Sequence, residues 1–237
     1  MPRIFIHDSL EINKEIKIID KIFHYLINVM RCKESDEVIL VNGKDGEFLS
    51  TIIFANNKYC IIKIIEKTRE YQPQPFLGLI FAPIQKIDIL IKSAVELGAT
   101  NFLPIKTEYT NKTSLKLDKI EGNIIEAIEQ CERLDIPTVN KINSIDKTLE
   151  SINDDKSIIL FCEERTAENQ IINIIKNNSL YNKKIYALVG PEGGFSDNEK
   201  KLIRTFKNVV SVSLGNNILR AETAAIAVLS IIKSTIN

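Results

Sequence analysis

The stretch Leu188–Ser196, near the end of the chain, most limits the folds open to this sequence; it reads Leu-Val-Gly-Pro-Glu-Gly-Gly-Phe-Ser. The apolar run Ile185–Val189 stops at Gly190-Pro191, which predicts a buried strand running into a turn whose main chain can be approached closely. Ser196 and Glu199 have the spacing of a capping box, in which each side chain satisfies a free backbone N–H of the other residue. Open α/β folds hold ligands at such loops, although an ordinary strand-to-helix connection has the same pattern.

A second glycine loop follows a short distance along the chain. Val209–Leu214 is another apolar strand, Gly215 opens the loop after it, and a helix of small and apolar residues extends to Ile236. Two strand–loop–helix units so close in sequence are expected to present their loops at the same edge of one sheet.

Taken together, the two loops resemble the SPOUT class of methyltransferases, and within it the RsmE-type enzymes that methylate N3 of a uridine in small-subunit ribosomal RNA. The matching words are Gly190–Ser196, Leu214-Gly215, Ile218–Arg220 and Glu222–Ala224. The resemblance implies S-adenosylmethionine as cofactor, a C-terminal trefoil knot that forms its pocket, and a homodimer. It also implies small-subunit ribosomal RNA, naked or in the assembled subunit, as the partner.

Length and composition fit this interpretation in part. The 237 residues, of which 44% are hydrophobic, are enough for one large domain or two small ones. No window of eighteen residues is apolar and uncharged, and the N-terminus lacks a signal-peptide pattern, so we expect a cytoplasmic protein without membrane contact. The net charge of zero is evidence against nucleic-acid binding, because no strongly basic domain is present, although folding can still gather a basic patch.

Metal and disulfide chemistry are not expected. The four cysteines, Cys32, Cys60, Cys131 and Cys162, are far apart and form no Cys-x-x-Cys pair. They are interpreted as reduced, partly buried thiols. The two histidines, His7 and His24, leave little for histidine-based metal or triad chemistry.

The first part of the chain has the pattern of a small β-barrel. A strand is expected at 3–6, and a helix capped by Asp20 is expected to bury Ile22, Phe23, Leu26, Val29 and Met30 and to end near Arg31. Three β-rich runs follow at 38–41, 48–54 and 59–65, joined by Asn- and Gly-rich turns. The proline-spaced stretch 71–75 is the best candidate for a linker. We therefore predict domains at 1–70 and 76–237.

From Phe76 onward the pattern changes to alternating strands and helices. Strands are expected at 76–82, 102–105, 157–161, 184–189 and 209–214. Helices are expected at 87–97, closed by Gly98, then from about Ile120 to before Pro137, at 167–176 and at 196–206. This alternation predicts an α/β fold with a mostly parallel sheet covered on both faces.

The resemblance extends over nearly the whole chain. His24–Leu26, Val29–Arg31, Lys33 and Val41–Gly43 look like the PUA-like N-terminal domain of RsmE proteins, and Lys92–Ala99 and Glu126–Arg133 match its middle region. It implies RNA contacts, for which the candidates are Arg3, Arg31, Lys33, Lys112 and Arg133. Arg31 also has the position of a cation that complements a helix macrodipole, and a solvated helix face explains Arg133 equally well.

Two departures from the family pattern concern cations. The family usually carries an Arg-Ser pair where this chain reads Thr107–Lys112, so Lys112 is expected to supply the charge there. It also commonly has an arginine in the loop that here reads Asn216-Asn217.

The resemblance and the loops together define a predicted cofactor site. Its adenine pocket needs apolar walls and exposed main-chain groups. These are expected from Leu188, Val189, Gly190, Glu192, Gly193, Gly194, Leu214, Gly215, Ile218, Leu219 and Arg220.

The reaction itself needs charge stabilisation and a proton acceptor. Loss of the N3 proton of uracil places negative charge on the flanking carbonyl oxygens, which a fixed guanidinium stabilises, and Arg220 is the candidate. Glu222 is the candidate proton acceptor or the group that orients Arg220. An ion pair is the alternative for Arg220, a first-turn helix carboxylate is the alternative for Glu222, and Glu192 is expected to hold a partner chain or a loop N–H.

Three other interpretations remain open. One is a catalytically silent RNA-binding protein that keeps the fold, supported by the departures at Lys112 and Asn217. A second is a methyltransferase of the same class with another RNA target. The third, a nucleotide-binding oxidoreductase, is disfavoured because the α/β region has no Gly-x-Gly-x-x-Gly word after its first strand.

Overall fold

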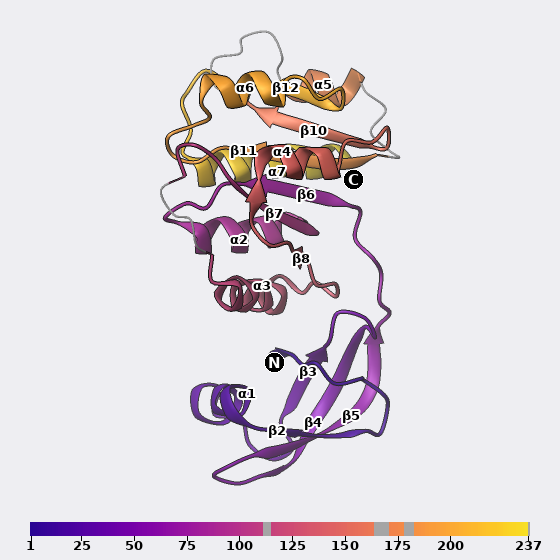
Figure 1. Cartoon of the computed structure of the whole chain (residues 1–237). Coiled ribbons are helices and arrows are strands. Elements are labelled where there is room, and N and C mark those ends of the chain that lie inside the picture. Colours follow the sequence, from indigo (N-terminus) through magenta and orange to yellow (C-terminus); the bar gives the residue numbers. More distant parts are fainter. Residues whose placement is uncertain (111–114, 164–170, 178–182, 237) are drawn as a thin grey trace. The chain divides into compact units, whose positions relative to one another are not determined.

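The computed structural model describes residues 1–110, 115–163, 171–177 and 183–236. The chain forms two compact units (Figure 1). The first comprises Met1–Gln74 and Ile128–Ile136, and the second comprises Pro75–Ala127 and Pro137–Asn237.

The first unit is built on a five-stranded sheet with the order β1-β3-β4-β5-β2. The strands are β1 (Arg3–Phe5), β2 (Glu15–Ile18), β3 (Glu37–Val41), β4 (Glu47–Ala55) and β5 (Cys60–Arg69). β1 pairs with β3 in parallel, and the other neighbours are antiparallel. The strand predicted at 3–6 and the three predicted from β-rich runs are confirmed, whereas β2 was not predicted. Side chains from all five strands pack into one apolar core, together with Phe23 and Leu26.

The predicted single helix after Asp20 is wrong in detail. The structure has a four-residue α1 (Asp20–Phe23) followed by a π-helix η1 (His24–Val29), in which Met30 N donates to Tyr25 O at 2.9 Å. Ile19 holds the N-cap position, and no side chain caps this helix. The wider π turn rotates the later residues away from the buried face. Val29 and Met30, predicted to be buried, are therefore 56% and 44% exposed, while Leu26 is fully buried.

The segment Ile128–Ile136 belongs to the first unit, although the predicted boundaries place it in the second domain. Glu129 Oε1 accepts the backbone N–H of Phe5 at 2.8 Å. Glu132 Oε2 lies 3.5 Å from Arg3 Nη2, and Glu132 O accepts from Arg69 Nη1 at 3.1 Å. These long-range polar contacts carry no local sequence signal, which is why the prediction missed them.

The second unit is a parallel sheet with the order β12-β10-β11-β6-β7-β8, and β9 pairs with β7. Every recorded pairing in it is parallel, as predicted. The strands are β6 (Leu77–Phe81), β7 (Asn101–Lys106), β8 (Thr138–Val139), β9 (Asn143–Ser144), β10 (Ser157–Cys162), β11 (Lys184–Val189) and β12 (Val209–Val212). The short strands β8 and β9 were not predicted.

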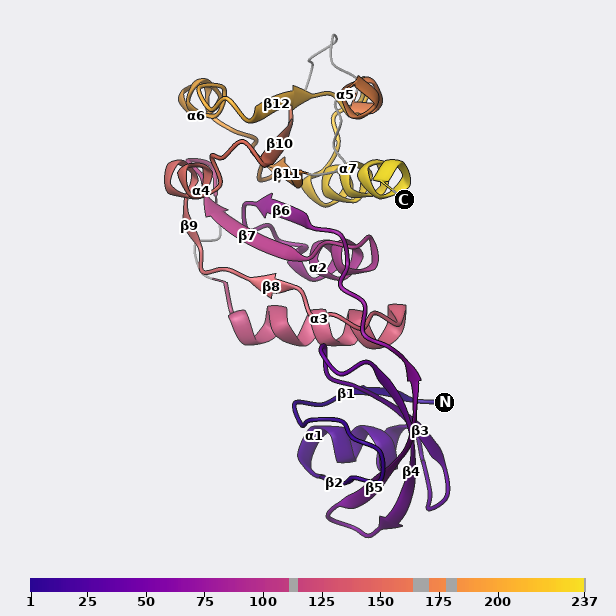
Figure 2. The same cartoon turned by 90° about the vertical axis from the view of Figure 1, so that its right-hand side faces the viewer.

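Helices cover both faces of this sheet (Figure 2). α4 (Ile145–Ser151) and α6 (Asp197–Ile203) pack together on one face, and α2 (Ile87–Glu96), α5 (Ile171–Asn177) and α7 (Ala221–Ile236) lie on the other. α3 (Leu117–Cys131) ends six residues before Pro137, earlier than predicted. The predicted helix at 167–176 is described from Ile171 only, and 167–170 lie outside the described residues.

Two consequences of the fold bear on function. The sheet order places β10 between β12 and β11, so the carboxyl ends of these three strands are neighbours. Open α/β sheets bind ligands at this kind of edge. No helix within the described residues has both the length and the apolar character needed to cross a membrane.

Candidate functional site

A capping box fixes the glycine loop after β11, as the sequence predicted. Ser196 Oγ accepts the N–H of Glu199 at 3.3 Å, and Ser196 N donates to Glu199 Oε2 at 2.9 Å. The second carboxylate oxygen, Glu199 Oε1, accepts the N–H of Glu108 at 2.8 Å. The start of α6 is therefore attached to the segment that follows β7, which holds the end of the glycine loop in place.

A cavity of about 430 Å³ lies at the carboxyl ends of β10 and β11 and against the loop that follows β12. Its size falls within the usual range of small-molecule sites, about 300–1,000 Å³. It is lined by Phe161, Cys162, Glu163, Val189, Gly190, Pro191, Glu192, Gly193, Gly194, Phe195, Lys200, Leu214, Gly215, Asn217, Ile218, Leu219, Arg220, Ala221 and Ala224.

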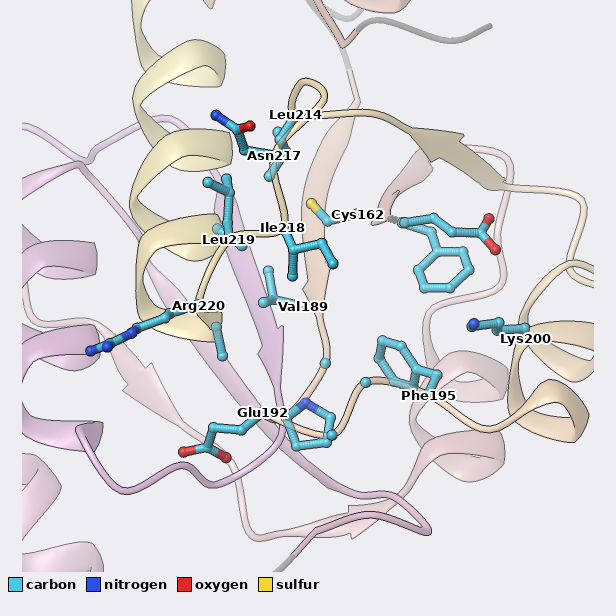
Figure 3. A pocket seen from close by; sticks show the side chains of 18 of the residues that line it. Cys162, Val189, Glu192, Phe195, Lys200, Leu214, Asn217, Ile218, Leu219 and Arg220 are labelled. Atoms are coloured by element: carbon cyan, nitrogen blue, oxygen red, sulfur yellow. The ribbon is translucent and has the colours of Figure 1, made fainter. Parts of the chain in front are cut away.

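Apolar side chains line the middle of the cavity, and charged side chains lie at its ends (Figure 3). Val189, Ile218 and Phe195 face its interior, while Glu192 and Arg220 lie at one end and Lys200 comes from α6 on the other side. The rings of Phe161 and Phe195 meet edge to face with centroids 5.4 Å apart. This arrangement suits a ligand with a flat apolar part and polar or charged ends.

Main chain forms part of the cavity surface at Gly194 and Gly215. Both have positive φ, +70° and +120°, and a Cβ atom at either position would have no neighbour within 4 Å. A side chain there would adopt a strained backbone and occupy open space beside the loop. The two loops thus keep their peptide groups accessible, as a nucleoside ligand read by main-chain hydrogen bonds requires.

The structure brings together all of the predicted cofactor-site residues except Leu188. Leu188 is fully buried and packs in the apolar core that includes residues of α4 and α6, so it does not line the cavity. Glu192 accepts the backbone N–H of Gln85 at 3.0 Å, which is the loop N–H expected as one of its two roles.

The two predicted catalytic residues have different surroundings. Arg220 is exposed and directly precedes α7, and its side chain extends away from the apolar centre of the cavity (Figure 3). Glu222 is 8% exposed and does not line the cavity; its Oε1 lies 3.5 Å from Lys86 Nζ. Lys86, the residue before α2, thus contacts the first turn of α7, and the sequence analysis did not predict this contact.

Sequence reasoning also missed Phe161–Glu163 and Lys200. The strand that ends at Phe161 was predicted, but no glycine word follows it, and only the sheet order places its end between the two glycine loops. Burial raises the pKa of the Cys162 thiol to about 12, so this cavity residue is a neutral thiol at physiological pH. Glu163 pairs with Arg204 of the segment that follows α6.

The predicted RNA contacts fall into three groups. Arg3 and Arg133 are engaged in buried ion pairs, with Glu47 at 2.6 Å and with Asp135 at 2.6 Å respectively, which gives them a structural role in the first unit. Arg31 and Lys33 are exposed just after η1, and Arg31 has a left-handed φ of 57°. Lys112 lies outside the described residues.

Comparison with known proteins agrees with this architecture. Residues 71–233 match the model of an RNA methyltransferase domain, and residues 18–65 match that of an RNA methyltransferase PUA domain. The chain is 36% identical to the ribosomal RNA small subunit methyltransferase E of Rickettsia conorii over 96% of its length and 93% of that relative. The chain belongs to the ribosomal RNA small subunit methyltransferase E family.

Two further comparisons concern the same family. The chain is 30% identical to the Buchnera aphidicola (subsp. Schizaphis graminum) methyltransferase E over 97% of the chain and 94% of the relative. A crystal structure of the Neisseria gonorrhoeae methyltransferase E bound to S-adenosyl methionine superposes with a TM-score of 0.87, at 23% identity, over 99% of this chain and 97% of that one. This likeness establishes the fold, and the PUA-domain match over residues 18–65 makes the first unit PUA-like.

Proposed function

We propose that this family member transfers the methyl group of S-adenosylmethionine to N3 of a uridine in small-subunit ribosomal RNA. The observation that carries the proposal is the cavity between two glycine loops in a chain of the methyltransferase E family. The volume of the cavity, the apolar side chains at its middle and its accessible main chain fit the cofactor. Val189, Ile218 and Leu219 would hold the adenine, and the backbone at Gly190 and Gly215 would read its edge.

When bound, the cofactor supplies an electrophilic methyl group on a sulfonium, so the chain's own tasks are alignment and proton management. Arg220, at the cavity end that also holds Glu192, would stabilise the negative charge that develops on the uracil oxygens. Glu222, buried in the first turn of α7, would accept the N3 proton.

RNA contact by the first unit is part of the proposal. Arg31 and Lys33 are exposed, and within the described residues neither takes part in an ion pair, so both are open to phosphate oxygens. Arg3 and Arg133 are left out because their guanidinium groups are committed to Glu47 and Asp135. The trefoil knot, a homodimer through helices beside the cofactor loops, and a cytoplasmic location also remain predictions from the resemblance.

The test is to incubate the protein with cofactor labelled in the methyl group and with small-subunit RNA that lacks the modification, as naked RNA and as assembled subunits. We expect label in RNA, and nucleoside mass analysis should identify it as N3-methyluridine. A different methylated nucleoside would indicate another target. RNA binding without transfer, although the cofactor binds, would favour the catalytically silent alternative.

A further inference from the structure

The segment between β6 and α2 contacts the glycine loop after β11 and the helix that follows the second glycine loop. The backbone N–H of Gln85 donates to Glu192 Oε1 at 3.0 Å, and Lys86 Nζ lies 3.5 Å from Glu222 Oε1. Glu192 belongs to the glycine loop after β11, and Glu222 belongs to the first turn of α7. Two consecutive residues thus bring this segment to the end of the cavity where Arg220 lies.

Glu222 is a buried carboxylate, and its charge needs a partner. Its side chain is 11% exposed, whereas that of Lys86 is 51% exposed. Removal of an ionised carboxylate from water is unfavourable unless a nearby cation or hydrogen bonds compensate it. Lys86 supplies that cation, and about half of its side chain remains exposed to solvent.

Other charged groups on the neighbouring elements have partners elsewhere or lie at the cavity mouth. On α2, Asp88 pairs with Lys119 and Asn123, and Lys92 pairs with Glu126. On α7, Lys233 donates to the carbonyl of Glu96. Arg220 precedes Glu222 by two residues, and its side chain extends away from the apolar centre of the cavity (Figure 3). Among the ion pairs of the described residues, Glu222 takes part in the one with Lys86.

We propose that Lys86 is a positioning residue of the active site, which orients the Glu222 carboxylate through their ion pair. This inference rests on the proposed function. In the proton-transfer step the N3–H bond of uracil breaks, its electron pair stays on nitrogen, and an O–H bond forms on Glu222. The contact with the Lys86 ammonium group fixes the orientation of the carboxylate that accepts this proton.

The test compares Lys86→Met, Lys86→Arg, Glu222→Gln and the double variant Lys86→Met/Glu222→Gln in single-turnover methylation of unmodified small-subunit RNA. Lys92→Met is the matched control, because Lys92 lies on the same helix but pairs with Glu126. A well-positioned general base typically contributes about 10²–10⁴-fold to the rate of proton transfer. We therefore expect Lys86→Met, which releases the Glu222 carboxylate from its ion pair, to lower the single-turnover rate at saturating RNA about tenfold or more, with unchanged cofactor affinity.

Lys86→Arg should restore most of the rate, because a guanidinium can keep the ion pair with Glu222, and Lys92→Met should match the wild type. The double variant should be no slower than Glu222→Gln alone, since Lys86 acts through Glu222. A Lys86→Met rate equal to that of the wild type, or a double variant whose losses multiply, would overturn the role of Lys86. If the wild type itself transfers no methyl group, the proposed function fails and this inference fails with it.

Discussion

The Phe195 ring packs directly against the main chain of Gly190: a Cβ atom added at Gly190 would lie 2.8 Å from Cε2 of that ring. Both residues line the cavity. A side chain at Gly190 would therefore displace Phe195 and, through it, the edge-to-face contact with Phe161.

Gly190→Val should therefore weaken cofactor binding by tenfold or more, since overpacking of this kind typically costs about 1–3 kcal/mol. Calorimetric titration with S-adenosylmethionine measures the effect. Gly122→Ala is the control, because a Cβ atom at this position of α3 has no neighbour within 4 Å. Normal titration by Gly190→Val would place the cofactor away from this loop.

Arg220→Ala should abolish most methyl transfer while leaving cofactor affinity within about threefold of the wild type. Loss of one preorganised charge-stabilising group typically lowers kcat by about 10²–10³. The Arg220 side chain extends away from the apolar centre of the cavity (Figure 3), so its removal leaves the adenine walls intact. Single-turnover rates and calorimetry separate the two effects. A parallel loss of affinity would give Arg220 a role in cofactor binding.

Glu47 should make the stability of the first unit depend on acid pH. Burial acts to raise the pKa of this carboxyl, but the Thr68 hydrogen bond, the Arg3 hydrogen bond and charge, and the Arg69 charge outweigh it and lower the pKa below its ordinary value of 4.5. A group with a lowered pKa stabilises the fold above its unfolded-state pKa, and this contribution is lost as the pH falls through the folded-state value.

Urea unfolding at several pH values between 7 and 3 tests this dependence. Wild-type stability should fall below about pH 4.5, and Glu47→Gln should be less stable at pH 7 but lose less on acidification. Glu37→Gln, at an exposed position of β3, is the control. Equal acid losses in the wild type and Glu47→Gln would show that other carboxyl groups dominate.

Cys162 should react slowly with iodoacetamide in the folded protein. Burial raises its thiol pKa to about 12, so the thiolate that attacks the reagent is scarce at pH 8. Mass spectrometry of the peptide that carries Cys162, after alkylation with and without denaturant, measures the protection. Rapid labelling of the native protein would mean that the thiol is ionised in the cavity.

Local patterns predicted the parts of the site that depend on local chemistry. The Ser196–Glu199 capping box involves residues three apart, and the glycine loops carry their conformational preference in their own residues. The positions of three residues were not predicted. Phe161 lines the cavity because of the order of the strands in the sheet, Arg3 forms an ion pair with Glu47 within the first unit, and Lys86 forms an ion pair with Glu222 of another element. Such contacts depend on tertiary packing, which sequence periodicity does not reveal.

The assignment of Ile128–Ile136 to the first unit has an evolutionary consequence. Glu129 accepts a hydrogen bond from Phe5, and Glu132 contacts Arg3 and Arg69. These three partners lie at least 60 positions earlier in the sequence. Recombination at a single junction near residue 75 would separate that acidic segment from the strands it contacts. The Phe5 N–H would then lose its Glu129 acceptor, and Arg3 would keep Glu47 but lose Glu132. The two halves of this enzyme are therefore expected to be inherited together, and grafting the first onto another catalytic body should succeed only when the acidic segment is transplanted with it.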